Sequence, residues 1–146
     1  MSGNITQVLP KASPQTEDYN CIAWAADDTS QCWWPDKMGI GYWPERVPRD
    51  ETLDSFIAAY RDIGYEVCND PMPELGYKKV AIYVDTEGKP THAARQLVSG
   101  NWTSKLGVSF DIEHDFFTEW PDIIVDALFH QTTDYGKLVV ILRKPV

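Results

Sequence analysis

Cysteine is scarce in this sequence, and the spacing typical of metal-binding cysteines is absent. The chain has three cysteines, at positions 21, 32 and 68, with no CxxC pair among them. An odd number without that spacing argues against a disulfide framework and against a zinc knuckle. Cys21, His92 and His114 together match no recognised zinc pattern either. We therefore expect free thiols, no metal and no cofactor, and we interpret Cys32 and Cys68 as structural.

Long apolar runs are also missing. No uninterrupted stretch approaches the roughly 18 residues of a membrane-spanning helix. Residues 1–17 are polar, contain two prolines and lack the apolar region of a secretory signal. The sequence therefore predicts a cytoplasmic protein with no membrane association. Its length predicts a single domain over residues 1–146, in which residues 1–17 form a flexible N-terminal arm.

Positive charge is the third scarcity. There are 13 Lys and Arg residues against 22 Asp and Glu, which gives a net charge of −9. Such a balance argues against nucleic acid as a partner, because binding to phosphates depends on Lys and Arg. No basic residue occurs between Lys105 and Lys137, a window that contains Asp111, Glu113, Asp115, Glu119, Asp122, Asp126 and Asp134. This window predicts either a solvated acidic face or a docking surface for a basic protein partner.

The first half of the chain contains two predicted helices. Asp18 or Asn20 can cap a helix that begins at Cys21, because a side-chain oxygen there accepts from otherwise unpaired N–H groups. A second helix is predicted between Asp50 and Gly64, since large apolar residues recur there at helical spacing. These apolar residues are Leu53, Phe56, Ile57 and Tyr60.

The second half of the chain is dominated by predicted strands. Residues 78–84, 91–98 and 101–106 are predicted to form three consecutive antiparallel strands, with a short strand at 65–68 and a buried last strand at 138–142. The segment 119–130 combines strand-favouring residues with a helical pattern, and we interpret it as a helix. Helices first and a sheet later, in separate blocks, predict the α+β class.

Cys21 and His92 are the two side chains that a cysteine nucleophile needs. The thiolate is the reactive form, and its pKa falls at a helix N-terminus beside an imidazolium. Cys21 starts the predicted helix, and His92 lies on a predicted strand from which it can point at a helix packed across the sheet. Strand alternation places Ala94 and Gln96 on the His92 face, which leaves room for a substrate beside a polar neighbour.

A catalytic imidazole also needs an orienting partner on its other nitrogen. If Ser99 and Gly100 form a two-residue turn, Ser104 lies on the face opposite to His92, whereas one bulge brings Ser104 to the His92 face. Asp111 is our preferred third residue, because a carboxylate stabilises an imidazolium better than a hydroxyl does, and His114 is held in reserve. The N–H of Cys21 and a second donor would stabilise an oxyanion. The residues predicted to bind the oxyanion or substrate are Gln15, Asn20, Gln96 and Ser104.

The motif order resembles the papain-like superfamily of cysteine hydrolases, especially its small bacterial NlpC-type branch. The segments 20–25 (NCIAWA), 92–96 (HAARQ) and 102–107 (WTSKLG) are similar to those of an uncharacterised bacterial domain family. That family also has an Ile-x-His element, here 112–114, and a Tyr-Gly near its end, here 135–136. The resemblance implies a papain-like fold with N-terminal helices packed on a central antiparallel sheet. It also places Gln15 at the position of the oxyanion glutamine, whereas related small domains carry a histidine at the place of Ser104.

Two functions follow from these patterns. The first is a thiol hydrolase or acyltransferase in which Cys21 attacks an amide or thioester of a peptide or protein substrate, His92 transfers the proton and Asp111 orients His92. The alternative is a non-catalytic acidic binding protein, of the immunity or inhibitor type, which docks a basic protein.

Overall fold

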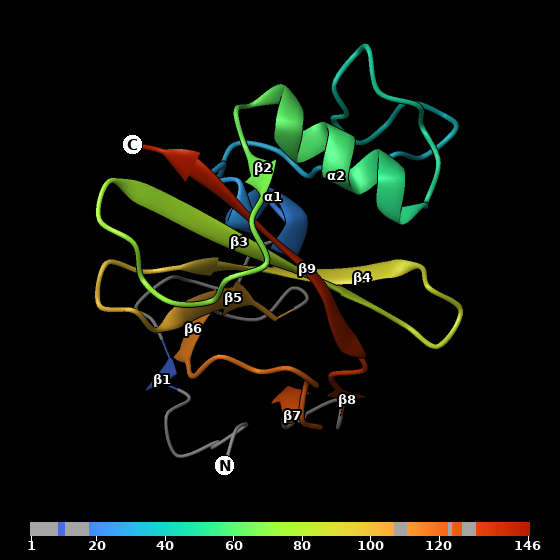
Figure 1. Ribbon diagram of the computed structural model, residues 1–146. Helices are drawn as coiled ribbons and strands as arrows, with labels where there is room; N and C mark the ends of the chain where they lie inside the picture. The colour runs from blue at the N-terminus through green and yellow to red at the C-terminus, as the bar shows by residue number, and fades with distance from the viewer. Residues whose placement is uncertain (1–8, 11–17, 107–110, 123, 127–130) are drawn as a thin grey trace.

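The computed structural model describes residues 9–10, 18–106, 111–122, 124–126 and 131–146. In this part of the chain, two helices and nine strands follow one another as shown in Figure 1. They are β1 (Leu9–Pro10), α1 (Cys21–Ala25), α2 (Leu53–Asp62), β2 (Glu66–Val67), β3 (Tyr77–Val84), β4 (Pro90–Gln96), β5 (Trp102–Lys105), β6 (Asp111–His114), β7 (Ile124–Asp126), β8 (Gln131–Thr132) and β9 (Lys137–Pro145). None of the described helices is both long and apolar enough to cross a bilayer.

Helix α1 is short because both of its ends are fixed by local chemistry. The side chain of Asn20 accepts from the N–H of Ala23 and so caps the first turn. The helix ends at Ala25, and Asp27 then takes a left-handed backbone conformation with a φ of 65°. Aspartate tolerates that conformation better than most residues with a Cβ atom. The helix is therefore limited to five residues.

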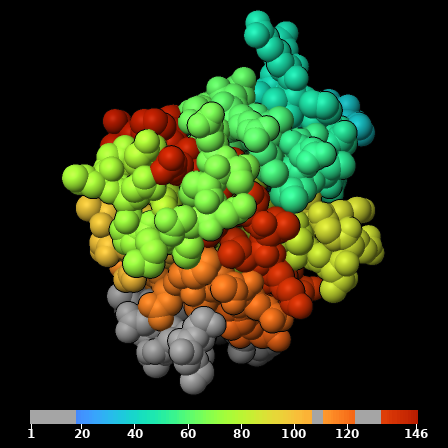
Figure 2. Space-filling model, viewed as in Figure 1, coloured from blue at the N-terminus to red at the C-terminus, as the bar shows by residue number. Residues whose placement is uncertain are grey.

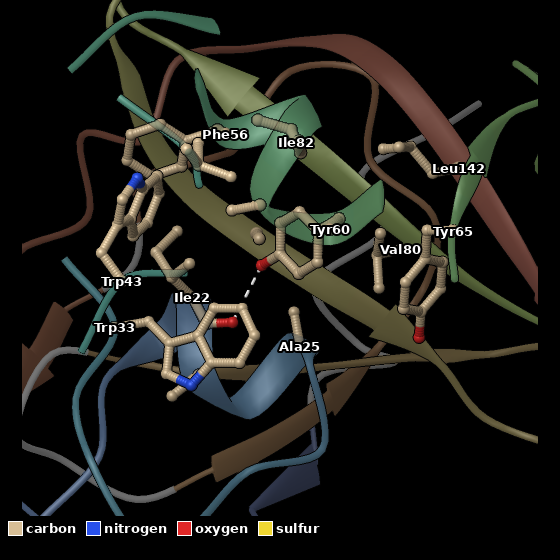
Figure 3. Close-up of a cluster of buried hydrophobic side chains, with 14 of the residues drawn as sticks. Ile22, Ala25, Trp33, Trp43, Phe56, Tyr60, Tyr65, Val80, Ile82 and Leu142 are labelled. Carbon is tan, nitrogen blue, oxygen red and sulfur yellow. Dashed lines mark hydrogen bonds between the residues drawn. The ribbon is translucent and has the colours of Figure 1, made fainter. Parts of the chain in front are cut away.

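Helix α2 confirms the strongest helical pattern in the sequence. It is capped by Thr52, whose side chain accepts from Ser55, and Asp50 accepts in turn from the Thr52 hydroxyl. Its buried face carries Phe56 and Tyr60. The Tyr60 hydroxyl donates to the carbonyl of Ile22 over 2.8 Å, which fixes α2 against α1 (Figure 3).

A seven-stranded sheet in the order β1-β6-β5-β4-β3-β9-β2 forms the body of the protein, and its neighbouring strands pair antiparallel. The predicted meander of β3, β4 and β5 is confirmed. The turn between β4 and β5 is one residue longer than expected, because Leu97 pairs with Asn101 and Gly100 adopts a φ of 96°. Glycine takes this conformation without steric cost. The extra residue shifts the register so that Gln96 lies opposite Trp102.

The long strand β9 connects two different ends of the molecule. Nine residues in a strand span about 30 Å. At one end, Lys137 lies beside Val84 and forms a backbone bridge with Glu119. At the other end, Pro145 lies beside Tyr77. The segment that follows β6 therefore lies near the N-terminal end of β9. The loop before β3 lies near the C-terminal end of β9.

Each face of the sheet carries its own hydrophobic cluster. The helices pack on one face, where Ile22, Trp33 and Phe56 contact residues from β3, β4 and β9 (Figure 3). We call this the helix face. The other face is covered by rings from the segment after β6, including Phe117 and Trp120. We call this the ring face. Figure 2 shows residues 111–122, in orange, on the outer surface over this part of the molecule.

The papain-like fold predicted from the motif order is wrong. The structure is mostly an antiparallel sheet, and its described helices are only 5 and 10 residues long. The α1 pattern cannot extend into a long helix because the chain turns at Asp27. The helix predicted over 119–130 is also wrong where the structure describes it, since Ile124–Asp126 form strand β7. Here the strand preference of β-branched residues prevailed over a helical pattern.

Candidate functional site

The thiol of Cys21 lies on the helix face of the sheet. Cys21 is partly buried and packs against the cluster that contains Ile22 and Ala93. Burial raises the pKa of its thiol to about 11, although the backbone N–H groups of Ala93 and Ile22 and the charge of Lys105 act in the opposite direction. Desolvation disfavours the thiolate. The thiol is therefore protonated at neutral pH, which is the reverse of an activated nucleophile.

The imidazole of His92 lies on the ring face. It is fully buried, stacks on Tyr135 with ring centroids 3.9 Å apart, and contacts Trp120 and Tyr83. Its neighbour in sequence, Ala93, belongs to the cluster on the helix face. Successive strand residues point to opposite faces. The structure consequently does not bring His92 together with Cys21, and the predicted dyad is not assembled in this arrangement.

Ser104 is the partner that the structure gives to His92. The His92 Nε2 and Ser104 Oγ atoms are 2.9 Å apart, and Ser104 Oγ lies 2.7 Å from His114 Nε2. His114 Nδ1 lies 2.6 Å from the carbonyl oxygen of Asp115. All three side chains are fully buried. The register of the β4–β5 turn produces this contact, because it places Ser104 on the His92 face, as the bulged alternative in the sequence required.

The direction of these hydrogen bonds can be worked out from one fixed acceptor. A carbonyl oxygen can only accept, so His114 Nδ1 carries the proton and His114 Nε2 is an acceptor. Ser104 must then donate to His114 and accept from the Nε2–H of His92. His92 Nδ1 is left as a lone pair, and it has no hydrogen-bond partner among the described residues. The network therefore holds two neutral imidazoles in defined tautomers.

Burial keeps both imidazoles neutral. Desolvation lowers the pKa of His114 to about 4, against the opposing effects of its bond to the Asp115 carbonyl and of the Glu113 charge. The pKa of His92 falls well below its usual value, first through burial and then through the charge of His114. A neutral His92 can accept a proton, yet the described residues place no carboxylate in contact with it to stabilise the resulting charge.

Asp111, the preferred orienting residue, lies on the other side of the sheet from His92. Asp111 is fully buried, accepts from the hydroxyl of Tyr19 over 3.2 Å and stands opposite Lys105 in the β5–β6 pairing. The next residue, Ile112, belongs to the cluster on the ring face. Asp111 is therefore closer to the surroundings of Cys21 than to those of His92. His114, the alternative orienting residue, is linked to His92 through the Ser104 hydroxyl.

The remaining predicted site residues have structural partners. Asn20 caps α1 and also bonds the backbone N–H and carbonyl of Trp33. Gln96 donates to the carbonyl of Pro71 over 2.7 Å and so holds the loop before β3. Gln15 lies outside the described residues. Within the described ranges, no three His, Cys, Asp or Glu residues are placed to hold a metal ion.

An acidic surface lies at the start of β9, and sequence reasoning identified it only as a window without basic residues. Glu119, Asp122 and Asp134 are exposed there, and Asp115 is partly buried beside them in sequence. The ion pairs found in the described part of the chain leave these four carboxylates out. We call these four residues the acidic end.

Comparison with known proteins gives a family and no activity. The family model described as Domain of unknown function (DUF7689) matches residues 11–143. The chain belongs to this family. Neither the curated proteins nor the solved structures contain a match. The matched range contains both helices, the acidic end and strands β2 to β8 with most of β9, whereas strand β1 lies just before it.

Proposed function

We propose that this protein is a non-catalytic binding protein whose acidic end docks a basic region of a partner protein. The observation that carries the proposal is the set of four carboxylates in the acidic end, which have no ion-pair partner among the described residues. A surplus of negative charge on one surface, here four carboxylates against Lys137, accelerates encounter with a basic partner and selects against others.

The state of the buried groups favours binding over catalysis. A cysteine hydrolase requires a thiolate and an imidazole in contact. Here Cys21 packs on the helix face and His92 on the ring face. The pKa of the Cys21 thiol is raised and that of His92 is lowered, so each group is held in its uncharged form. Cys21, Cys32 and Cys68 form no disulfide in the described part of the chain, which supports the cytoplasmic location that belongs to this proposal.

A charge-reversal experiment tests the proposal. The test variant carries Asp115→Lys, Glu119→Lys and Asp122→Lys. The matched control carries Glu45→Lys, Glu51→Lys and Asp62→Lys, which are exposed positions in the helical part of the molecule. Both variants change the net charge equally, so a general field effect would weaken both alike.

Binding is measured by calorimetry with a lysine- and arginine-rich peptide at 50 and 300 mM salt. We expect the control to retain most of the affinity and the test variant to lose about tenfold or more, with wild-type binding weakened by salt. Equal losses in the two variants would show that only net charge matters and would remove the acidic end from the proposal.

A further inference from the structure

A second surface feature lies at the finish of β9, at the opposite end of that strand from the acidic end. A cleft of about 570 Å³ is lined by the loop 73–76, the first residues of β3, and residues 95–98 at the end of β4 and in the turn that follows it. The loop and the turn after β4 are in direct contact, because Pro73 approaches the backbone of Gly100. Figure 2 shows the loop, in green, beside this turn at the left edge of the view. The volume is that of a small-molecule site.

The walls of this cleft expose apolar side chains. Leu75 is 101% exposed and Val98 is 106% exposed, and both line the cleft together with Pro73 and Leu97. Single exposed apolar residues are ordinary on protein surfaces, whereas several around one concavity indicate a binding site. The cleft therefore offers an apolar wall to a ligand.

At the same end of the sheet, β3 and β9 carry several basic residues, although the protein as a whole is acidic. In the pairing of β3 with β9, Lys78 lies opposite Lys144 and Lys79 lies opposite Arg143. Like charges directly opposite one another are unfavourable. Glu74 bridges Lys79 and Arg143, but Lys78 and Lys144 have no carboxylate partner among the described residues. An anion bound here would relieve this repulsion.

Arg95 is a fixed cation on the wall of the cleft. Its side chain is only 16% exposed, its Nε donates to the carbonyl of Trp24, and its guanidinium lies 4.8 Å from the centre of the Trp24 ring. Asp27 is its ion-pair partner in the described part of the chain, at 3.9 Å and with a 56% exposed side chain. The Nη1 group has no hydrogen-bond partner in the part of the chain that the structure describes. A planar guanidinium held in this way presents a fork of donors suited to a carboxylate.

We propose that this cleft binds a small amphipathic carboxylic acid, whose carboxylate pairs with Arg95 and whose apolar chain lies against Leu75 and Val98. The site is independent of the acidic end and of the function proposed for it. A small acid is the ligand chosen because the cleft has the volume of a single small molecule and couples one fixed cation to an apolar wall.

The ligand chemistry is tested by calorimetry on the wild-type chain at 0.15 M salt, where repulsion by the net negative charge is screened beyond about 8 Å. Octanoate is the probe, octylamine has the same chain with the opposite charge, and acetate has the charge without the chain. We expect octanoate to bind at least about tenfold more tightly than either comparison molecule. Equal binding of octylamine, or no binding of octanoate at millimolar concentration, overturns the proposal.

Three variants locate the site without depending on Arg95, whose loss would also disturb Trp24. Val98→Asp places a charge on a fully exposed wall residue and should weaken octanoate about tenfold, whereas Met38→Asp, at an exposed apolar residue outside the cleft, should change nothing. Asp27→Asn removes the carboxylate that pairs with Arg95, and asparagine suits the left-handed backbone there. It should tighten octanoate about twofold to fivefold. Unchanged binding in both cleft variants would place the ligand elsewhere and refute the assignment.

Discussion

The buried His92–Ser104–His114 network should make this protein sensitive to mild acid. An unfolded histidine has a pKa of about 6.5, whereas burial lowers the pKa of folded His114 to about 4. Between these values the unfolded chain binds more protons than the folded chain. The stabilisation that depends on neutral His114 is therefore present above about pH 6.5 and is lost as the pH falls toward 4.

The size of this effect follows from the two pKa values. For His114 alone, the free energy of unfolding should decrease by about 2 kcal/mol between pH 7 and pH 5. His92 contributes in the same direction, because its pKa is also lowered by burial. Carboxyl groups with lowered pKa values stay ionised over this range; the pKa of Asp28 is about 2, lowered by hydrogen bonds that outweigh its desolvation. The histidines therefore dominate the slope.

The assay is urea unfolding followed by tryptophan fluorescence at pH 7, 6 and 5. His114→Gln is the matched variant, because it keeps a neutral polar side chain that does not titrate and leaves His130 unchanged. We expect its stability to depend on pH by about 2 kcal/mol less than that of the wild type. An identical pH dependence in both proteins would refute the argument that His114 is buried and neutral.

A second measurement does not require the variant to fold. Nitrogen-15 NMR of the wild-type imidazoles reports which ring nitrogen carries the proton. The hydrogen-bond directions predict a proton on Nδ1 of His114 and on Nε2 of His92. The opposite tautomer at either ring would contradict the derived direction of the network.

Three further predictions concern single positions. Ser104→Ala leaves a buried donor and a buried acceptor without partners, so it should cost about 2–5 kcal/mol in urea unfolding, whereas Ser99→Ala, at an exposed serine, should cost less than about 0.5 kcal/mol. Because its thiol pKa is raised to about 11, Cys21 should react with iodoacetamide at pH 7 about 300-fold more slowly than a free cysteine of pKa about 8.5, and a rate close to the free thiol would contradict the assigned burial. Gly136→Ala should lower the thermal unfolding temperature more than Gly88→Ala does. Both glycines have a positive φ, but only at position 136 would the new Cβ atom approach the Val84 carbonyl oxygen. Equal losses in the two variants would mean that this close approach is absent.

Apolar spacing and residue preference within a short segment correctly predicted one helix and several strands. Apolar spacing identified α2, and Gly64 follows it with a φ of 105° where the helix stops. Strand-favouring residues identified β3 to β5 and β9. The pattern failed for Ile124–Asp126, where a helical periodicity and β-branched residues pointed to different structures and the residues formed a strand. Periodicity alone cannot decide such short segments.

The contact between Ser104 and His92 depends on the register of β4 and β5, which the sequence alone did not determine. The turn chemistry around Gly100 decided the register, and one additional turn residue moved Ser104 to the face of His92. A sequence offers both turn lengths, and their difference in energy depends on how the paired strands pack. The partnership of Ser104 with His92 was therefore one of two open alternatives until the register was known.

The sequence by itself determined that Ala93 and His92 must point to opposite faces of β4, because strand side chains alternate. It also determined that Cys21 starts a helix capped by Asn20 and that one segment carries acid without a base. Only the tertiary structure decided that α1 packs on the Ala93 face, which separates the thiol from the imidazole. Alternation fixes two faces, but the burial of apolar area against the rest of the chain determines which of them a helix covers.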